Sequence, residues 1–260
     1  MPGLWTSAKG SSVEPCQVCL DKNFPPAHAI NWEVGLWALP IPGGKENSVR
    51  NMKDDVKERI IRESLKLFLA KGYSGSTTNE LVRLAGVSKG ALYWHFESKE
   101  DILSTILDRY SDGFIEETVR RMDSSSGPFP CKFKDFYKFT TEFSRDNHEL
   151  LLVFITLLLE FSGSGSEIEK RMKELYNRYT QVIQKMIEEG IRDGSVRRGI
   201  DPILFSRFIS NAFTGSLVQW FLSLSSSGYD PSSTVQYAIM QRDEILRMVS
   251  SRESQMAEDA

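Results

Sequence analysis

The sequence predicts an all-α protein made of a small three-helix head and a larger helical body. Apolar residues recur at spacings of three and four along most of the chain, and capping residues and glycines separate these runs. No segment alternates apolar and polar residues as a half-buried strand would. The 260 residues, 40% of them hydrophobic, are enough for one or two domains with a core.

Residues 1–51 lack this pattern. They are rich in Pro, Gly and Ser, so we expect an unstructured extension, and we hypothesise that translation starts at Met52. An intact mass that includes Trp5 would exclude that start. Cys16 and Cys19 form half of a structural zinc site, but neither His28 nor the distant Cys131 completes it. Incidental cysteines are therefore the preferred interpretation, and we expect neither a metal site nor a cofactor.

The head is predicted to span residues 52–98, and its first helix runs from Asp55 to Gly72. Apolar residues recur on one face of this helix, charged residues lie between them, and Gly72 ends it. Two short helices alone bury too little surface to be stable. We therefore expect this helix to pack over the two that follow.

The second helix has a start signal and a stop signal. Thr77 and Glu80 form a capping box, in which each side chain satisfies a free backbone N–H, so a helix begins near Thr78. Leu81 falls on its apolar face, and Gly86 supplies the left-handed conformation that ends a helix without steric cost.

The third helix is expected from about Ser88 to His95, with Leu92 and Phe96 in the core. Three consecutive aromatic residues, from Tyr93 to His95, cannot all face inward on a short helix. The opposite side carries Lys89, Gly90, Tyr93 and His95.

Two short helices joined by a glycine turn are typical of a helix-turn-helix, whose second helix enters the major groove of DNA. Gly90 would let the backbone approach closely. Threonines at a helix N-terminus suit a phosphate. The candidate phosphate contacts are Lys89, Tyr93, His95, Thr77 and Thr78. From these residues alone, an ordinary helical hairpin with core aromatics remains an equal alternative.

The run from Val56 to Ile106 resembles the N-terminal domain of the tetracycline-repressor (TetR) family. The likeness rests on three segments at the family's spacing. They are Phe68-Leu69-Ala70-Lys71-Gly72-Tyr73, Thr77-Thr78 and Ser88-Lys89-Gly90-Ala91-Leu92-Tyr93-Trp94-His95-Phe96. The resemblance implies a DNA-binding head, a body that binds a small molecule, and a homodimer formed through the last two long helices. The predicted DNA surface comprises Thr77, Thr78, Ser88, Lys89, Gly90, Ala91, Tyr93, Trp94, His95 and Lys99.

The charge distribution agrees with this placement. The whole chain has a net charge of −3, but residues 52–99 hold nine Lys and Arg against six Asp and Glu, a local charge of +3. The bias supports phosphate contact only weakly, because many solvated helical faces carry a similar excess.

The body, residues 99–260, reads as a series of helices. The expected ranges are Lys99 to Arg121, Lys132 to Asn147, His148 to Phe161, Glu167 to Arg192, Pro202 to Ser223 and Pro231 to Ser251. The longest apolar run, Leu150 to Leu159, is about half of the roughly 20 residues that span a bilayer, so it predicts a buried helix. With no signal-peptide pattern at the start of the chain, we expect a cytoplasmic protein without membrane contact.

The last two helices carry wide apolar faces. A four-helix interface between two copies would cover them, with Gly215 and Ala212 permitting close approach. Burial within a monomer is the alternative.

Aromatic residues of the middle helices are candidate walls of an effector pocket. Each one alone is more often core, but their number favours a hydrophobic or aromatic effector. The candidates are Phe114, Phe136, Phe139, Phe143, Phe154, Tyr176 and Tyr179. Asn147, His148, Glu160 and Gln184 could supply polar contacts.

The sequence thus predicts a ligand-responsive transcriptional regulator, a dimeric repressor released from a palindromic DNA operator by a hydrophobic or aromatic small molecule. A helical small-molecule-binding protein without DNA contact is the alternative. An enzyme is not expected, because the chain has no phosphate-binding glycine loop, His-Glu-x-x-His motif or nucleophile elbow.

Overall fold

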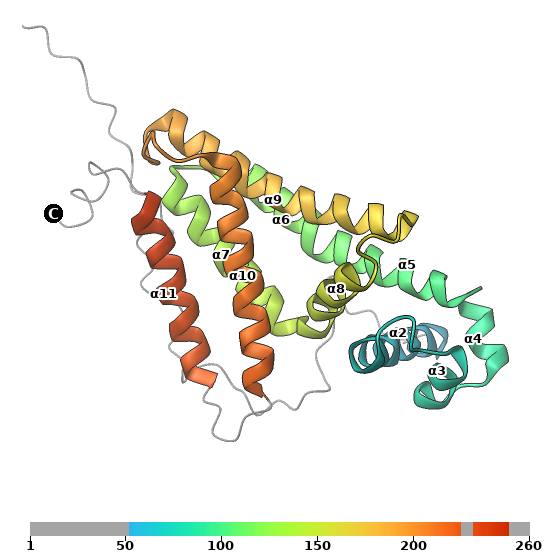
Figure 1. The fold of residues 1–260 in the computed structure, drawn as a ribbon. Helices are drawn as coiled ribbons and strands as arrows, with labels where there is room; N and C mark the ends of the chain where they lie inside the picture. Colours follow the sequence, from blue (N-terminus) through green and yellow to red (C-terminus); the bar gives the residue numbers. More distant parts are fainter. Residues whose placement is uncertain (1–51, 225–230, 250–260) are drawn as a thin grey trace, which may run out of the picture.

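The computed structural model describes residues 52–224 and 231–249 (Figure 1). These residues are helical and contain no β-strand, which confirms the all-α class. The elements are α2 (Met52–Lys71), α3 (Thr78–Ala85), α4 (Lys89–His95), α5 (Lys99–Tyr110), the π-helical η2 (Ser111–Glu116), α6 (Glu117–Ser124), α7 (Phe129–Asp146), α8 (His148–Glu160), α9 (Glu167–Asp193), α10 (Pro202–Leu224) and α11 (Pro231–Val249). The predictions for residues 1–51, including Cys16 and Cys19, lie outside the described residues.

Helices α2, α3 and α4 form the head at one end of the molecule (Figure 1). The predicted capping box is present: the Thr77 hydroxyl accepts from the Glu80 N–H at 3.2 Å, and the Glu80 carboxylate accepts from the Thr77 N–H at 3.2 Å. Gly86 ends α3 with a φ of +59°. Phe68 on α2 and Leu92 on α4 are fully buried, so the three helices share a core as predicted.

Helices α5 and α6 form one continuous run that joins the head to the body, as predicted, but a π-helical segment interrupts it. Within this segment Phe114 and Ile115 are both buried, and Gly113 lies against the ring of Phe143, where a Cβ would come within 3.4 Å of Cε2. Helix α7 begins at Phe129 rather than at the predicted Lys132, because Pro130 is tolerated in the first turn.

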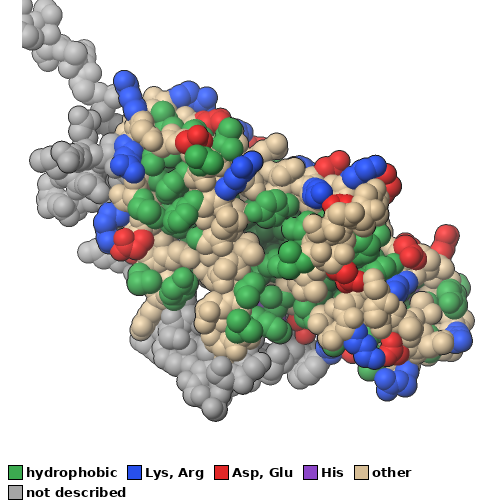
Figure 2. Space-filling view, in the orientation of Figure 1, with side chains coloured by type: hydrophobic (Ala, Val, Ile, Leu, Met, Phe, Trp, Pro, Cys, Tyr) green, Lys and Arg blue, Asp and Glu red, His purple; other side chains and the backbone are tan. Residues whose placement is uncertain are grey.

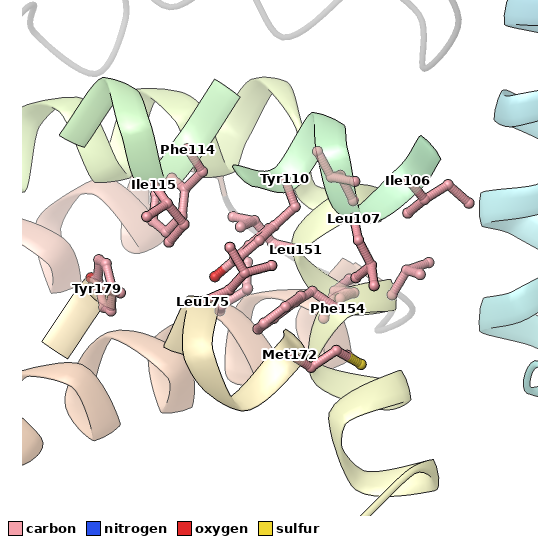
Figure 3. Packing of buried hydrophobic residues seen from close by; sticks show 14 of the residues in the cluster. Ile106, Leu107, Tyr110, Phe114, Ile115, Leu151, Phe154, Met172, Leu175 and Tyr179 are labelled. Carbon is pink, nitrogen blue, oxygen red and sulfur yellow. The ribbon is translucent and has the colours of Figure 1, made fainter. Parts of the chain in front are cut away.

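The body packs α7, α8 and α9 against the α5–α6 run. Helix α10 packs on α9 and crosses it at a steep angle, and α11 lies beside α10 and α7 (Figure 1). Its core includes Tyr110 of α5, Leu151 and Phe154 of α8, and Met172 and Leu175 of α9, whose side chains gather between the three helices (Figure 3). The buried cluster runs without interruption from the head into the body. The two regions are therefore joined by packing as well as by the chain.

Candidate DNA-binding face and effector core

Helix α4 has a buried side and an exposed side. Leu92 is fully buried and Phe96 is 2% exposed, whereas Tyr93 and Trp94 are 53% and 63% exposed. Lys89 and Gly90 are also exposed. The predicted division of this helix is confirmed for these residues, and its outer side presents a cation and two aromatic rings at the surface.

Within the part of the chain that the structure describes, nothing in conformation or packing requires a glycine at position 90. A Cβ built there would meet only the Ser88 hydroxyl, at 3.8 Å. That hydroxyl already caps α4 by accepting from the Ala91 N–H at 3.0 Å, while Ala91 itself is half-buried. The open space above Gly90 is therefore available to a close-fitting partner.

The remaining predicted contacts of the head differ in how free they are. The imidazole of His95 is half-buried and lies edge-on to Trp94, with 4.6 Å between the ring centroids. The Thr77 hydroxyl is engaged in the capping box, and Thr78 is half-buried at the first position of α3.

Lys99 makes its described contacts inside the protein. Its ammonium donates to the carbonyl oxygens of Tyr73 at 2.8 Å and Ser76 at 2.9 Å, and it lies 4.1 Å from the centroid of the Tyr73 ring. Helix α5 is thereby tied to the loop between α2 and α3. DNA contact by Lys99 stays a prediction.

The aromatic residues proposed for the effector come together in the body. Phe114 is the centre of the cluster, with ring centroids 5.1 Å from Phe143, 5.3 Å from Tyr179 and 6.2 Å from Phe139. Phe136 lies 5.8 Å from Tyr179. All are packed in the core except Phe143, which is half-buried.

The cluster also includes rings that the sequence did not single out. Phe154 stacks on Tyr110 at 3.8 Å, and Phe213 of α10 lies 6.4 Å from Phe114. Tyr110 is one helical turn before Phe114, a spacing that was available as a signal. Phe213 lies on a helix whose apolar residues were expected to face a second copy of the chain, and the packing of α10 on α9 brings its ring to Phe114 instead.

Among the residues that the structure describes, the Tyr179 hydroxyl is buried without a hydrogen-bond partner. Burial, with the nearby hydroxyls of Tyr110 and Tyr137, raises its pKa well above the ordinary value, so it remains a protonated donor. The half-buried Tyr176 accepts a long 3.5 Å hydrogen bond from Ser210. A donor left unpaired among aromatic rings costs about 1–3 kcal/mol and is a natural contact for a polar atom of a ligand.

The candidate polar contacts lie elsewhere. Asn147 donates to the Phe143 carbonyl at 3.1 Å, His148 lies edge-on to Trp220 at 5.3 Å, and Gln184 donates to Glu188 at 2.8 Å. Glu160 faces the head. Its carboxylate bonds the loop between α2 and α3 rather than the aromatic cluster.

A surface pocket of about 230 Å³ lies between α6 and α9, away from the predicted residues. Met122, Val182 and Met186 form part of its wall, and Arg178 and Lys185 lie at it. Both cations are paired with acidic residues, Arg178 with Glu116 and Lys185 with Asp123. None of the seven predicted effector residues lines this pocket.

Helices α10 and α11 divide their apolar residues between two sides. Ile209, Leu217 and Ile245 are buried within the chain. The outer side exposes Ile203, Leu204, Phe208, Val218, Phe221 and Leu222 of α10 and Tyr237, Met240 and Met248 of α11. Apolar side chains accordingly appear over this part of the body in Figure 2.

No helix within residues 52–224 or 231–249 has the length and apolar character to cross a membrane. Across the same residues, no three His, Cys, Asp or Glu side chains are grouped so that they could hold a metal ion.

Comparison with known proteins identifies both parts of the chain. Residues 60–106 match the family described as bacterial regulatory proteins, tetR family, and residues 111–236 match the C-terminal region of YsiA-like proteins. The HTH-type transcriptional repressor DhaR of Mycobacterium sp. (strain GP1) is 24% identical over 182 residues, which cover 70% of this chain and 90% of DhaR.

The HTH-type transcriptional regulator QacR of Staphylococcus aureus is 30% identical over 147 residues, covering 54% of this chain and 73% of QacR. The structure of FadR from Bacillus subtilis in complex with stearoyl-CoA superposes with a TM-score of 0.55 at 22% identity, covering 75% of this chain and 97% of FadR. The two named relatives are transcriptional regulators, and the resemblance expected from the head extends into the body. The chain therefore belongs to the TetR family of bacterial regulatory proteins.

Proposed function

We propose that this chain is a ligand-responsive transcriptional repressor that binds a palindromic DNA operator as a homodimer and is released by a hydrophobic or aromatic small molecule. The observation that carries the proposal is the outer side of α4, which exposes Lys89, Tyr93 and Trp94 together with Gly90, a glycine that no contact within the described residues requires. A ligand-binding protein without DNA contact has no use for such a side.

A second copy of the chain is the proposed partner of the outer side of α10 and α11. A large apolar patch on one chain marks an interface, and a two-fold axis places two recognition helices about 34–36 Å apart, one turn of DNA. Gly215 supports close helix contact, because a Cβ there would meet no atom of residues 52–224 or 231–249 within 4 Å.

Paired leucine variants test the dimer. Leu204→Glu places a charge on the proposed interface, whereas Leu159→Glu places one on α8, where Leu159 is 73% exposed and off that surface. Sedimentation equilibrium should show that Leu204→Glu shifts the protein to monomer while Leu159→Glu remains dimeric. Equal behaviour of the two variants would contradict this interface.

Selection from a random DNA pool at about 0.15 M salt tests DNA binding. Wild-type protein should enrich a palindromic site. The Lys89→Ala, Tyr93→Ala double variant should bind that site at least about tenfold more weakly, since it loses a phosphate contact and an aromatic contact. Lys138→Ala, which removes an exposed lysine from α7, is the charge-matched control and should bind as wild type. Specific binding that survives in the double variant would refute the named surface.

The effector is proposed to bind at the aromatic cluster, where it gives the Tyr179 hydroxyl a partner. FadR of Bacillus subtilis, solved with stearoyl-CoA, supports an effector with a large apolar part. An effector that binds better to the form with misplaced heads must weaken DNA binding by reciprocal linkage. Stearoyl-CoA and a panel of aromatic compounds are the first probes for release of the selected DNA.

Two tyrosine variants test the role of that hydroxyl. Tyr179→Phe removes an unpartnered donor, so the free energy of unfolding should not fall, while the active probe should release DNA less efficiently. Tyr137→Phe removes a hydroxyl that donates to Gln241, so it should destabilise the fold without changing release. Unchanged release by Tyr179→Phe would remove Tyr179 from the effector site.

A further inference from the structure

The loop between α2 and α3 is held from two sides by charged residues of the body. The Lys99 ammonium, at the start of α5, donates hydrogen bonds to two carbonyl oxygens of this loop. The Glu160 carboxylate, at the end of α8, accepts hydrogen bonds from two backbone N–H groups of the loop. The N–H of Tyr73 donates to Oε2 at 2.8 Å, and the N–H of Ser74 donates to Oε1 at 2.7 Å. Two helices of the body therefore hydrogen-bond to the same short loop of the head.

The junction around Glu160 is closely fitted. Gly72 adopts a φ of +73°, and a Cβ at that position would lie 3.0 Å from Oε2 of Glu160. The ring of Tyr73 packs between Phe68 of α2 and Phe161 after α8, with 5.4 Å between centroids in each pair. A charged acceptor that bonds two backbone donors is among the stronger hydrogen-bond arrangements in proteins.

Helix α8 also passes through the aromatic cluster. Phe154, six residues before Glu160, stacks on Tyr110 at 3.8 Å, and Leu157 is fully buried. Figure 1 shows α8 reaching from the body toward α2. The middle of this helix thus lies in the proposed effector core and its end lies on the head.

We infer that Glu160 is a positioning residue for DNA recognition, which fixes the head on the end of α8 so that the orientation of α4 follows the position of α8. The inference rests on the proposed function. The head is thus connected to the body twice, covalently through α5 and by hydrogen bonds through Glu160. A movement of α8 in the core reaches the head through Glu160 and the N–H groups of Tyr73 and Ser74.

The chain offers a matched control in Glu169. Its carboxylate also accepts two loop N–H groups, from Gly163 at 2.8 Å and Gly165 at 2.7 Å. These bonds stay within the body, between the α8–α9 turn and the first turn of α9. Glu169 is more deeply buried than Glu160 and also pairs with Lys173, so its removal should cost the fold at least as much as removal of Glu160, while it leaves the contact between α8 and the head intact.

The test compares Glu160→Ala, Glu160→Gln and Glu169→Ala in the full chain, with the DNA site that wild-type protein selects. Both alanine variants should lower the melting temperature. Only Glu160→Ala should weaken DNA binding, by about tenfold, because an unfixed head must be ordered on binding. The salt dependence should not change, since the phosphate contacts are the same. Amide exchange at Tyr73 and Ser74 should accelerate about tenfold or more in Glu160→Ala and stay as in wild type in Glu169→Ala.

Glu160→Gln keeps one carbonyl acceptor, so its DNA affinity and its exchange rates at Tyr73 and Ser74 should lie between those of wild type and Glu160→Ala. If the alanine variant does not fold, the glutamine variant takes its place in the comparison. Equal DNA affinity of Glu160→Ala and Glu169→Ala, or unchanged exchange at Tyr73 and Ser74, would overturn the inference while leaving DNA binding intact. Failure of wild-type protein to select any site would instead overturn the proposed function, and the inference with it.

Discussion

Aromatic side chains are placed in opposite ways in two regions of the molecule. On α4, Tyr93 and Trp94 are 53% and 63% exposed, whereas in the body Phe114 is 1% exposed with five other rings within 6.4 Å of its centroid. Burial rather than residue type separates rings whose removal should destabilise the fold from rings that lie on the surface of the head. The two regions should therefore respond to substitution in different assays.

The largest loss of stability is expected at the centre of the body cluster. Phe114→Ala removes a fully packed ring and leaves a cavity, which should lower the free energy of unfolding by about 3–5 kcal/mol. Chemical denaturation measures this change. A loss below about 1 kcal/mol would show that the cluster is loosely packed and would remove the contrast with α4.

One glycine in each region sharpens the comparison, with a smaller expected loss of stability than at Phe114. A Cβ at Gly190 would lie 2.6 Å from Cγ2 of Val196 and 2.7 Å from Cβ of Phe129, so Gly190→Ala should cost about 1–3 kcal/mol through overpacking. At Gly90 there is room for a methyl group. Gly90→Ala should leave stability unchanged or raise it by up to about 1 kcal/mol, because alanine favours helix, and should weaken DNA binding. Thermal unfolding and DNA titration of both variants measure these effects. Equal destabilisation by Gly190→Ala and Gly90→Ala would contradict the expected difference between the two positions.

The smallest stability effects are expected on the outer side of α4. Tyr93→Ala and Trp94→Ala should each change the free energy of unfolding by no more than about 0.5 kcal/mol, because the rings are exposed. Their DNA affinity should nevertheless fall. Denaturation combined with DNA titration measures both quantities, and a loss of stability above about 2 kcal/mol in either variant would assign that ring to the fold.

Much of the head could be predicted from the sequence because its signals are local. The capping box joins residues three positions apart, and Gly86 ends α3 through its own backbone conformation. Leu92 is buried and Tyr93 exposed, which the helical period predicts from spacing alone. The exposed side of α4 could be predicted for the same reason.

The body was less predictable in its details. A π-helical turn at Ser111–Glu116 depends on how Phe114 and Ile115 pack, and a spacing rule for regular helices does not contain it. Spacing also could not divide α10 between an inner side that includes Leu217 and an outer side that includes Phe208. That division follows from where α9 and α11 lie.

By itself, the sequence determined the helices, their caps and the exposed side of α4, because each depends on interactions within about one helical turn. Only the tertiary structure decided the role of Glu160, whose charge and position in a mostly apolar helix were compatible with an effector contact. Its partners, Tyr73 and Ser74, lie 87 and 86 residues earlier in the chain. Packing of α8 against α2 brings them together, and that packing depends on the shapes of many buried side chains at once.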